Sequence, residues 1–260
     1  MDLERDSLLY GITDIVRDAG RLLLDAVNIE ESVEKKSGRA NFVTRYDKQV
    51  QEFLFERLGE LVPEAVFIGE EEEQHAQLPA SAAFIIDPID GTTNFMKNYQ
   101  VSCISVALLQ GGIPLAGVIY NPYLDELFTA WRGNGAFLNG SPIRVSDHSL
   151  KEGLVLLGTA PYNPELSQQT FTLAYELFKR SLDIRRSGSA ALDLCSIACG
   201  RAELFFELLL SPWDFAAGAL LVREAGGEIR SVDGEMLSFD RKQGIVAGTP
   251  EAIRQWRKLF

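Results

Sequence analysis

The sequence predicts a layered α+β fold, because two amphipathic helical patterns precede a run of short strands, and helices then alternate with strands to the end of the chain. Residues 3–27 carry apolar side chains at helical spacing, and a second helical pattern covers about 47–61. Beyond it the apolar residues gather into short runs bounded by Gly, Pro and Asn, as in strands. We therefore expect a sheet core behind two helices.

The remaining elements follow in order. The strand-like runs are AVFI, AFII, CISVALL, LAGVIY and ELFTA, and RGNGAFLNG is predicted to be a turn. Beyond it we expect helices near 165–180, 189–199 and 214–225, strands at ELFFE and IVAG, and a final helix. No internal repeat or long linker interrupts the chain. We expect one compact unit, 1–260, with subdomains of about 1–145 and 146–260.

Composition narrows the classes of function. The formal net charge of −12 argues against general binding to nucleic acid or anionic membranes, which needs clustered Lys and Arg. No apolar run approaches the roughly eighteen residues of a membrane span, and the first residues are charged, so we expect a cytoplasmic protein. Three cysteines without a CxxC motif predict neither a disulfide framework nor a zinc knuckle. An anionic substrate would then need bound cations.

The most informative segment is DPIDGTTNF, in which an apolar strand ends at Asp87 and a second carboxylate, Asp90, follows three residues later. Gly91, Thr92 and Thr93 would open a helix or turn whose free N–H groups form a phosphate cradle. Two carboxylates about 4 Å apart repel by roughly 4 kcal/mol at an effective dielectric near 20. Mg²⁺, which prefers hard oxygen ligands, would relieve that repulsion, although a capped turn is the alternative interpretation.

Three more carboxylates are candidates. Glu70 follows a strand directly and opens an acidic run that is otherwise typical of a solvated loop. Asp214 lies in the first turn of the helix PWDFAAG, where helix capping explains it equally well. Asp47 closes the sequence TRYD, which has the spacing of a capping box. For both aspartates the capping role and the site role stay open.

Taken in order, GEE (69–71), DPIDGTTNF (87–95) and WDFAAG (213–218) resemble the inositol monophosphatase family of lithium-sensitive, magnesium-dependent phosphatases. The resemblance extends over nearly the whole chain and includes VTRYD, SGSAALDL and EAGGEI. It implies an αβαβα sandwich of helices and two sheets, shared with fructose-1,6-bisphosphatase. It also implies a homodimer.

The resemblance further implies a ligand set for two or three Mg²⁺ ions per site. Glu70, Asp87 and the backbone carbonyl of Ile89 would hold one ion, and Asp87, Asp90 and Asp214 would hold a second. Glu70 would help to place a third, and Asp90 would also contact the substrate.

Catalysis and substrate binding are assigned by the same resemblance. Thr92, hydrogen-bonded to Asp47, would orient the attacking water, and the N–H groups of Gly91, Thr92 and Thr93 would hold the phosphate. Lys36 matches a position in a mobile loop that closes over the metals in this family.

Recognition of the alcohol falls to fewer residues. Ala190 and Glu207 match positions that touch the inositol hydroxyls, although Glu207 is equally well explained as a charge at a strand end. Ser189 replaces the commoner Thr, as it does in relatives that accept fructose 1,6-bisphosphate.

The reaction implied is in-line hydrolysis of a phosphate monoester without a phosphoenzyme, most favourably myo-inositol 1-phosphate. Fructose 1,6-bisphosphate, histidinol phosphate and 3′-phosphonucleotides are alternative substrates. A haloacid-dehalogenase-type phosphatase disagrees in motif spacing, because two residues separate Asp87 from Asp90 where its signature has one. A different class, a regulatory binding protein that keeps this fold, also stays open.

Overall fold

The structure is a computed structural model that describes residues 2–35, 42–72 and 77–259. Its first sheet has seven strands in the order β3-β4-β5-β6-β7-β8-β9, and only the β3–β4 pair is parallel. The strands are β3 (Val66–Gly69), β4 (Ala82–Asp90), β5 (Cys103–Gln110), β6 (Ile113–Asn121), β7 (Glu126–Trp131), β8 (Ala136–Leu138) and β9 (Ser141–Ile143).

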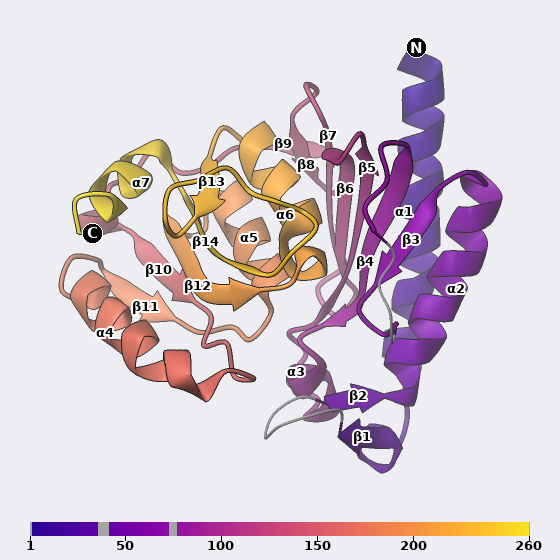
Figure 1. The fold of residues 1–260 in the computed structure, drawn as a ribbon, viewed down its shortest axis with the longest axis horizontal. Coiled ribbons are helices and arrows are strands. Elements are labelled where there is room, and N and C mark those ends of the chain that lie inside the picture. Colours follow the sequence, from indigo (N-terminus) through magenta and orange to yellow (C-terminus); the bar gives the residue numbers. More distant parts are fainter. Residues whose placement is uncertain (1, 36–41, 73–76, 260) are drawn as a thin grey trace.

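Two long helices, α1 (Asp2–Leu24) and α2 (Arg45–Leu61), cover the outer face of this sheet (Figure 1). Their apolar stripes supply Val16 and Leu54, which are fully buried against Phe84 of β4. The predicted helices at 3–27 and 47–61 are therefore confirmed within a few residues. Their burial against one sheet face explains the helical spacing of the apolar residues.

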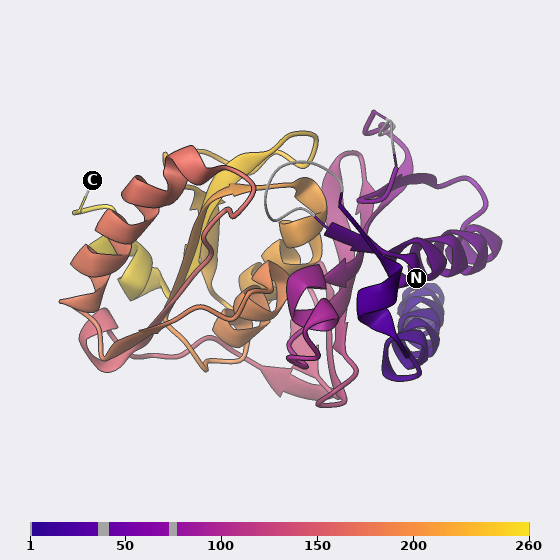
Figure 2. The same cartoon turned by 90° about the horizontal axis from the view of Figure 1, so that it is seen from below.

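A second sheet has five strands in the order β11-β10-β12-β14-β13. The strands are β10 (Leu154–Leu157), β11 (Asp183–Arg185), β12 (Leu204–Leu210), β13 (Glu228–Ser231) and β14 (Gln243–Gly248). Helices α4 (Ser167–Phe178) and α7 (Pro250–Trp256) pack on its outer face, where Phe206 meets Trp256 with ring centroids 5.5 Å apart. Figure 2 shows these helices at the opposite side of the molecule from α1 and α2.

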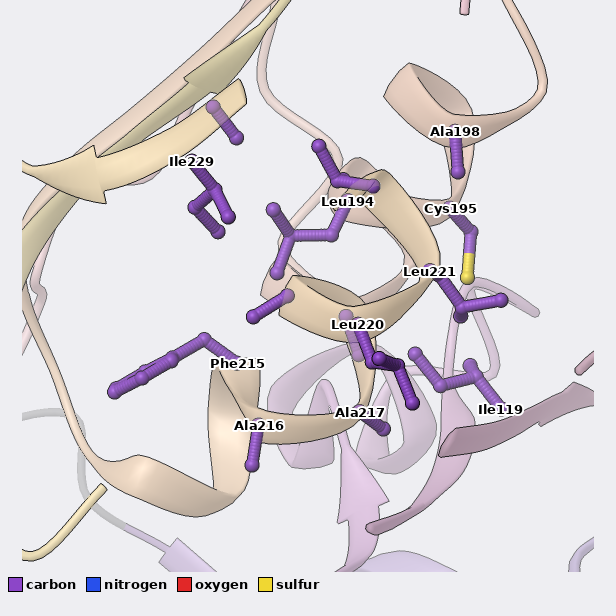
Figure 3. Close-up of a cluster of buried hydrophobic side chains, with 14 of the residues drawn as sticks. Ile119, Leu194, Cys195, Ala198, Phe215, Ala216, Ala217, Leu220, Leu221 and Ile229 are labelled. Atoms are coloured by element: carbon purple, nitrogen blue, oxygen red, sulfur yellow. The ribbon is translucent and has the colours of Figure 1, made fainter. Parts of the chain in front are cut away.

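The two sheets enclose the helices α5 (Ala190–Ala198) and α6 (Pro212–Glu224). Figure 3 shows Leu221 of α6 beside Cys195 of α5 and on the side of Ile119 from the first sheet, and Leu194 of α5 on the side of Ile229 from the second. The layers are thus α, β, α, β and α, and the predicted sandwich is confirmed. The helix pair in the middle joins the halves of the chain through one apolar core.

Some elements differ from the sequence prediction. The segment predicted as a turn, 132–140, contains the short strand β8, because its backbone pairs with β7 on one side and with the edge strand β9 on the other. The smaller elements are α3 (Thr92–Met96), β1 (Val33–Lys35), β2 (Phe42–Thr44) and 3₁₀ turns at Ile29–Ser32, Leu150–Glu152 and Pro164–Leu166. Strands β1, β2, β9, β10, β11 and β13 were not predicted.

The first sheet ends at Ile143 and the second begins at Leu154. The division into subdomains at about 145 stays a prediction. Across the described ranges, none of the helices combines the length and apolar character that a membrane crossing requires.

Candidate active site

A cavity of about 870 Å³ opens where the β4–α3 junction faces the first turns of α5 and α6 and the strand β12. Most of the residues that the sequence assigned to the site line this cavity. They are Glu70, Asp87, Ile89, Asp90, Gly91, Thr92, Thr93, Ala190, Glu207 and Asp214. Asp47 does not line the cavity. Lys36 falls outside the residues that the structure describes.

The carboxylates reach the cavity because β4 extends beyond β3, its parallel neighbour. Pairing with β3 stops at Ile86, and a bulge in the pairing with β5 separates Asp87 from Asp90. Pro88, which has no N–H, lies within that bulge. The strand was predicted to end at Asp87, but it continues to Asp90, so that both carboxylates are held by strand backbone rather than by a free turn.

Glu70 reaches the same wall from β3. Its backbone N–H donates to the carbonyl of Ile86 at 3.2 Å, which continues the parallel ladder by one step and sets Glu70 beside the end of β4. The side chain is half-buried. In the adjoining segment the N–H of Ile89 donates to Oδ1 of Asp87 at 3.1 Å, and Asp87 is only 1% exposed.

The phosphate cradle predicted at Gly91–Thr93 begins a short helix. Gly91 is the N-cap residue of α3 with φ 89°, and a side chain there would approach the carbonyl of Val101 at 2.9 Å. Both the left-handed backbone and the close approach therefore require glycine. The first N–H groups of a helix have no intrahelical acceptor, and here they follow the two carboxylates directly.

Asp47 both caps α2 and binds Thr92. Its Oδ2 accepts the N–H and the hydroxyl of Thr44 at 2.7 and 2.6 Å, which completes the capping box. Its Oδ1 lies 3.2 Å from the hydroxyl of Thr92 and can accept its proton. The capping role and the site role that the sequence left open are therefore compatible in one side chain.

Asp214 shows the same double use. It is the third residue of α6, and its Oδ2 accepts the N–H of Ser211 at 2.6 Å in a second capping box. The half-buried side chain also lines the cavity. The helix start thus fixes a carboxylate that is far from Glu70 and Asp90 in sequence but lines the same cavity.

Asp90 ties the first sheet to the middle helices. Its Oδ2 accepts the hydroxyl of Ser189 at 2.5 Å and the N–H of Ala191 at 2.7 Å, both at the start of α5. Burial raises the pKa of Asp90, and these donors oppose the rise. The carboxylate therefore helps to set the two halves of the cavity in register.

Electrostatics make this wall costly for anions. Burial raises the pKa of Asp87 well above its usual range, and the charges of Glu70, Asp90 and Asp214 raise it further. For Asp214 the same direction follows from burial, then Glu70 and Asp90. Converging carboxylates that disfavour one another's ionisation are the donor set that a divalent cation stabilises.

The residues present therefore fit magnesium in donor chemistry and charge. Their oxygens are spread along the wall rather than gathered at one point, since no three Asp, Glu, His or Cys side chains in the described ranges form a ready metal-coordination cluster. Cation binding would have to pull the carboxylates together against the strand and helix ends that hold them.

Glu207 lies on the other side of the cavity, in the second sheet. It is 7% exposed, its Oε1 accepts the N–H of Ala160 at 2.8 Å, and Gly158 leaves room for the carboxylate where any side chain would collide with it. Burial raises its pKa to about 7. Ala190, the first residue of α5, also lines the cavity.

The sequence did not assign several other lining residues. Asp193 is 3% exposed, and burial raises its pKa well above the usual range. Asp193 lies four residues after Ser189, so helical spacing could have predicted that both face the same side of α5. Arg186, Arg241 and Lys242 bring positive charge to the mouth, and no motif marked them.

Known proteins share this fold. The inositol monophosphatase family matches residues 4–258. Inositol monophosphatase 3 of Solanum lycopersicum is 40% identical over 244 residues, covering 91% of this chain and 89% of that protein. Nus factor SuhB of Salmonella typhimurium strain LT2 is 38% identical over 240 residues, covering 92% and 90%. The crystal structure of the extragenic suppressor protein suhB from Bartonella henselae has a TM-score of 0.90 and 36% identity, covering 97% and 98%.

The fold and its carboxylate-lined cavity define a phosphatase of the metal-dependent sandwich class. The chain belongs to the inositol monophosphatase family, as its three ordered motifs predict. That membership supports magnesium-dependent phosphatase activity and leaves the substrate to be established.

We predict that Asp87→Asn stabilises the metal-free protein at pH 8. The raised pKa of Asp87 means that its ionisation weakens the fold as the pH rises through the native-state value, and asparagine removes that charge while keeping an acceptor for Ile89. We expect the melting temperature in EDTA to rise by about 2–4 °C, the effect of about 1 kcal/mol in a chain of this size. Glu64→Gln, an exposed carboxylate, is the control, and a lower melting temperature for Asp87→Asn would contradict the assignment.

Glu207 predicts a pH dependence of stability. Because its pKa is raised to about 7 from 4.5, the native state binds a proton more tightly than the unfolded state, so stability falls as the pH rises from about 4.5 through 7. The loss is up to about 3 kcal/mol at 1.36 kcal/mol per pKa unit. Denaturant titrations at pH 5 and pH 8 should show a smaller loss for Glu207→Gln than for wild type; equal losses would show that Glu207 titrates normally.

Proposed function

We propose that this protein hydrolyses phosphate monoesters with Mg²⁺, and that myo-inositol 1-phosphate is its preferred substrate. The observation that carries the proposal is the wall formed by Glu70, Asp87 and Asp90, which passes directly into the N-terminus of α3. A dianionic ester needs cations to approach such a wall and free N–H groups to receive its oxygens. Both requirements meet at one end of β4.

The residues that would hold two or three Mg²⁺ ions are Glu70, Asp87, Asp90, Asp214 and the carbonyl of Ile89. When bound, the ions would supply Lewis acidity toward the phosphate and the attacking water. The protein's contribution is to hold these oxygens at fixed strand and helix ends. The bulge in β4 turns the Ile89 region toward the cavity, which that residue lines.

Thr92 is the residue best placed to orient the attacking water. Its hydroxyl has two acceptors within reach, Oδ1 of Asp47 at 3.2 Å and the carbonyl of Ile89 at 3.1 Å. When the hydroxyl of Thr92 donates its hydrogen bond to Asp47, a lone pair of Thr92 is left to accept a hydrogen bond from the attacking water. By accepting this hydrogen bond, Asp47 holds the hydroxyl in that orientation.

The leaving alcohol would lie toward the second sheet. Glu207 offers carboxylate oxygens to hydroxyl donors, and the small side chain of Ala190 leaves space beside it. A ring with several hydroxyls fits such a surface better than a purely apolar alcohol does. This supports inositol 1-phosphate, while fructose 1,6-bisphosphate, histidinol phosphate and a 3′-phosphonucleotide are the alternatives with the same chemistry.

A regulatory role is a second candidate, because one of the similar proteins carries the name Nus factor. The protein would then use its surface to bind another macromolecule, in addition to or in place of catalysis. Recovery of the same bound partners by wild type and by Asp90→Asn would support a role independent of catalysis. We also propose that the protein acts in the cytoplasm as a homodimer.

Thr92 gives a direct test of the mechanism. We predict that Thr92→Ala lowers kcat by about 100-fold or more, because the water loses its orienting acceptor, while the Mg²⁺ concentration for half-maximal activity changes little. Thr93→Ala is the matched control, since its exposed side chain is removed while its backbone N–H is kept. Equal kcat values for the two variants would exclude Thr92 as the orienting group.

Glu207 tests the substrate. Phosphate release should depend on Mg²⁺, stop in EDTA and be fastest with inositol 1-phosphate. Glu207→Ala should lower kcat/KM for inositol 1-phosphate by roughly 10- to 100-fold, the loss of a hydrogen bond to a charged group. Hydrolysis of p-nitrophenyl phosphate, which has no hydroxyl ring, serves as the control. Equal losses on both esters would remove Glu207 from recognition, and faster hydrolysis of another ester would reassign the substrate.

A further inference from the structure

One buried amide side chain approaches the carboxylates of the cavity from the outer helix layer. Gln51 lies on α2, one helical turn after Asp47, and it is only 7% exposed. Residues four positions apart share one face of a helix, so Asp47 and Gln51 point from α2 in the same direction. Asp47 contacts Thr92 from this face, whereas Gln51 contacts the segment that follows β3. One face of α2 therefore contacts two separate segments of the candidate site.

Gln51 contacts the residues on both sides of Glu70. Its Oε1 accepts the N–H of Glu71 at 3.0 Å. Its amide also lies against Gly69, where an added Cβ would come within 2.6 Å of Cδ of Gln51, closer than van der Waals contact allows. Glycine at position 69 is therefore required by this close approach. Glu70 lies between two residues that the same amide contacts.

This contact matters because β3 is an edge strand. In the described ranges β3 is the last strand of the seven-stranded sheet and pairs with β4. The N–H of Glu70 extends that pairing by donating to the carbonyl of Ile86. Beyond a sheet edge, the next N–H has to find another acceptor, and for Glu71 that acceptor is Gln51. The backbone that carries the carboxylate of Glu70 is therefore held by β4 and by α2.

The position of Glu70 affects the other carboxylates of the wall. After burial, the charge of Glu70 is the largest cause that raises the pKa of Asp87 and of Asp214. Movement of Glu70 would therefore change the field and the set of oxygens that a cation meets. A neutral amide can hold this segment without adding another negative charge to the repulsion.

We propose that Gln51 is a positioning residue for magnesium, which holds Glu70 where its carboxylate can join Asp87 at a cation and thereby sets the affinity of the site. The inference rests on the proposed magnesium-dependent function and adds a residue that none of the sequence motifs contains. Gln51 does not line the cavity, so it acts through the backbone of residues 69–71. Residues that hold metal ligands in place commonly change metal affinity by roughly 10- to 100-fold when they are mutated.

Calorimetric titration of Mg²⁺ into the metal-free protein tests this role without turnover. Gln51→Met keeps a long unbranched side chain but removes the oxygen acceptor, and we expect the dissociation constant to rise about tenfold. Gln51→Glu keeps an oxygen acceptor and should bind Mg²⁺ at least as tightly as wild type. Gly69→Ala should weaken binding as Gln51→Met does, because the added methyl group displaces the amide.

Gln49→Met is the matched control, because Gln49 is exposed on the same helix and should keep the wild-type dissociation constant. All titrations are made below the melting temperature of each variant in EDTA, so that unfolding is not mistaken for loss of affinity. At saturating Mg²⁺, the KM of Gln51→Met for p-nitrophenyl phosphate should stay near that of wild type.

The outcomes separate this role from the function on which it rests. An unchanged dissociation constant in Gln51→Met or Gly69→Ala, or equal weakening in Gln51→Glu or Gln49→Met, would overturn the positioning role while the metal site stands. If wild type bound no Mg²⁺, the metal site would be overturned, and the role of Gln51 with it. If wild type bound Mg²⁺ but hydrolysed no ester, the phosphatase proposal alone would be overturned.

Discussion

Repulsion among buried and half-buried carboxylates is the constraint on which the rest of this site depends. Asp87, Asp90 and Asp214 are held within electrostatic reach of one another and of Glu70, in surroundings that raise their pKa values. Such a cluster weakens the fold unless protons or cations compensate it. The protein accepts that cost at a point where strand and helix ends already restrain each carboxylate.

The restraint comes from residues that have two roles, one in the local structure and one in the cavity. Asp47 and Asp214 are the third residues of helices whose N-termini they cap, and each also serves the cavity. The bulge in β4 that interrupts the ladder is what presents Asp87 and Asp90 on one short segment. Because capping and ladder contacts exist before any ion or substrate binds, the strand and helix ends that carry the carboxylates are already in place, and the side chains have to move together around a cation. The candidate site is thus formed by helix N-caps and a β-bulge.

Much of this arrangement was predictable from sequence. The two N-terminal helices, the strands β3 to β7 and the cluster of motif carboxylates carry strong local patterns, and the first layers follow from them. Strands β10, β11 and β13 could not be predicted, because short runs such as Asp183–Arg185 acquire strand character only from their neighbours in the sheet. The continuation of β4 to Asp90 depends on pairing with the next strand, β5, which the local pattern of the segment did not reveal. Arg186 was missed because nothing in an RRSG sequence says which arginine points into a cavity.

The central claim is that the carboxylate wall is a cation site, and proton linkage tests it most directly. Mg²⁺ would be titrated into the metal-free protein at pH 6.5 by calorimetry, in two buffers of different ionisation enthalpy. Since raised pKa values mean that part of the cluster is protonated before the ion arrives, we predict that binding releases protons and that the observed heat depends on the buffer. Absence of binding, or binding whose heat is the same in both buffers, would contradict the account.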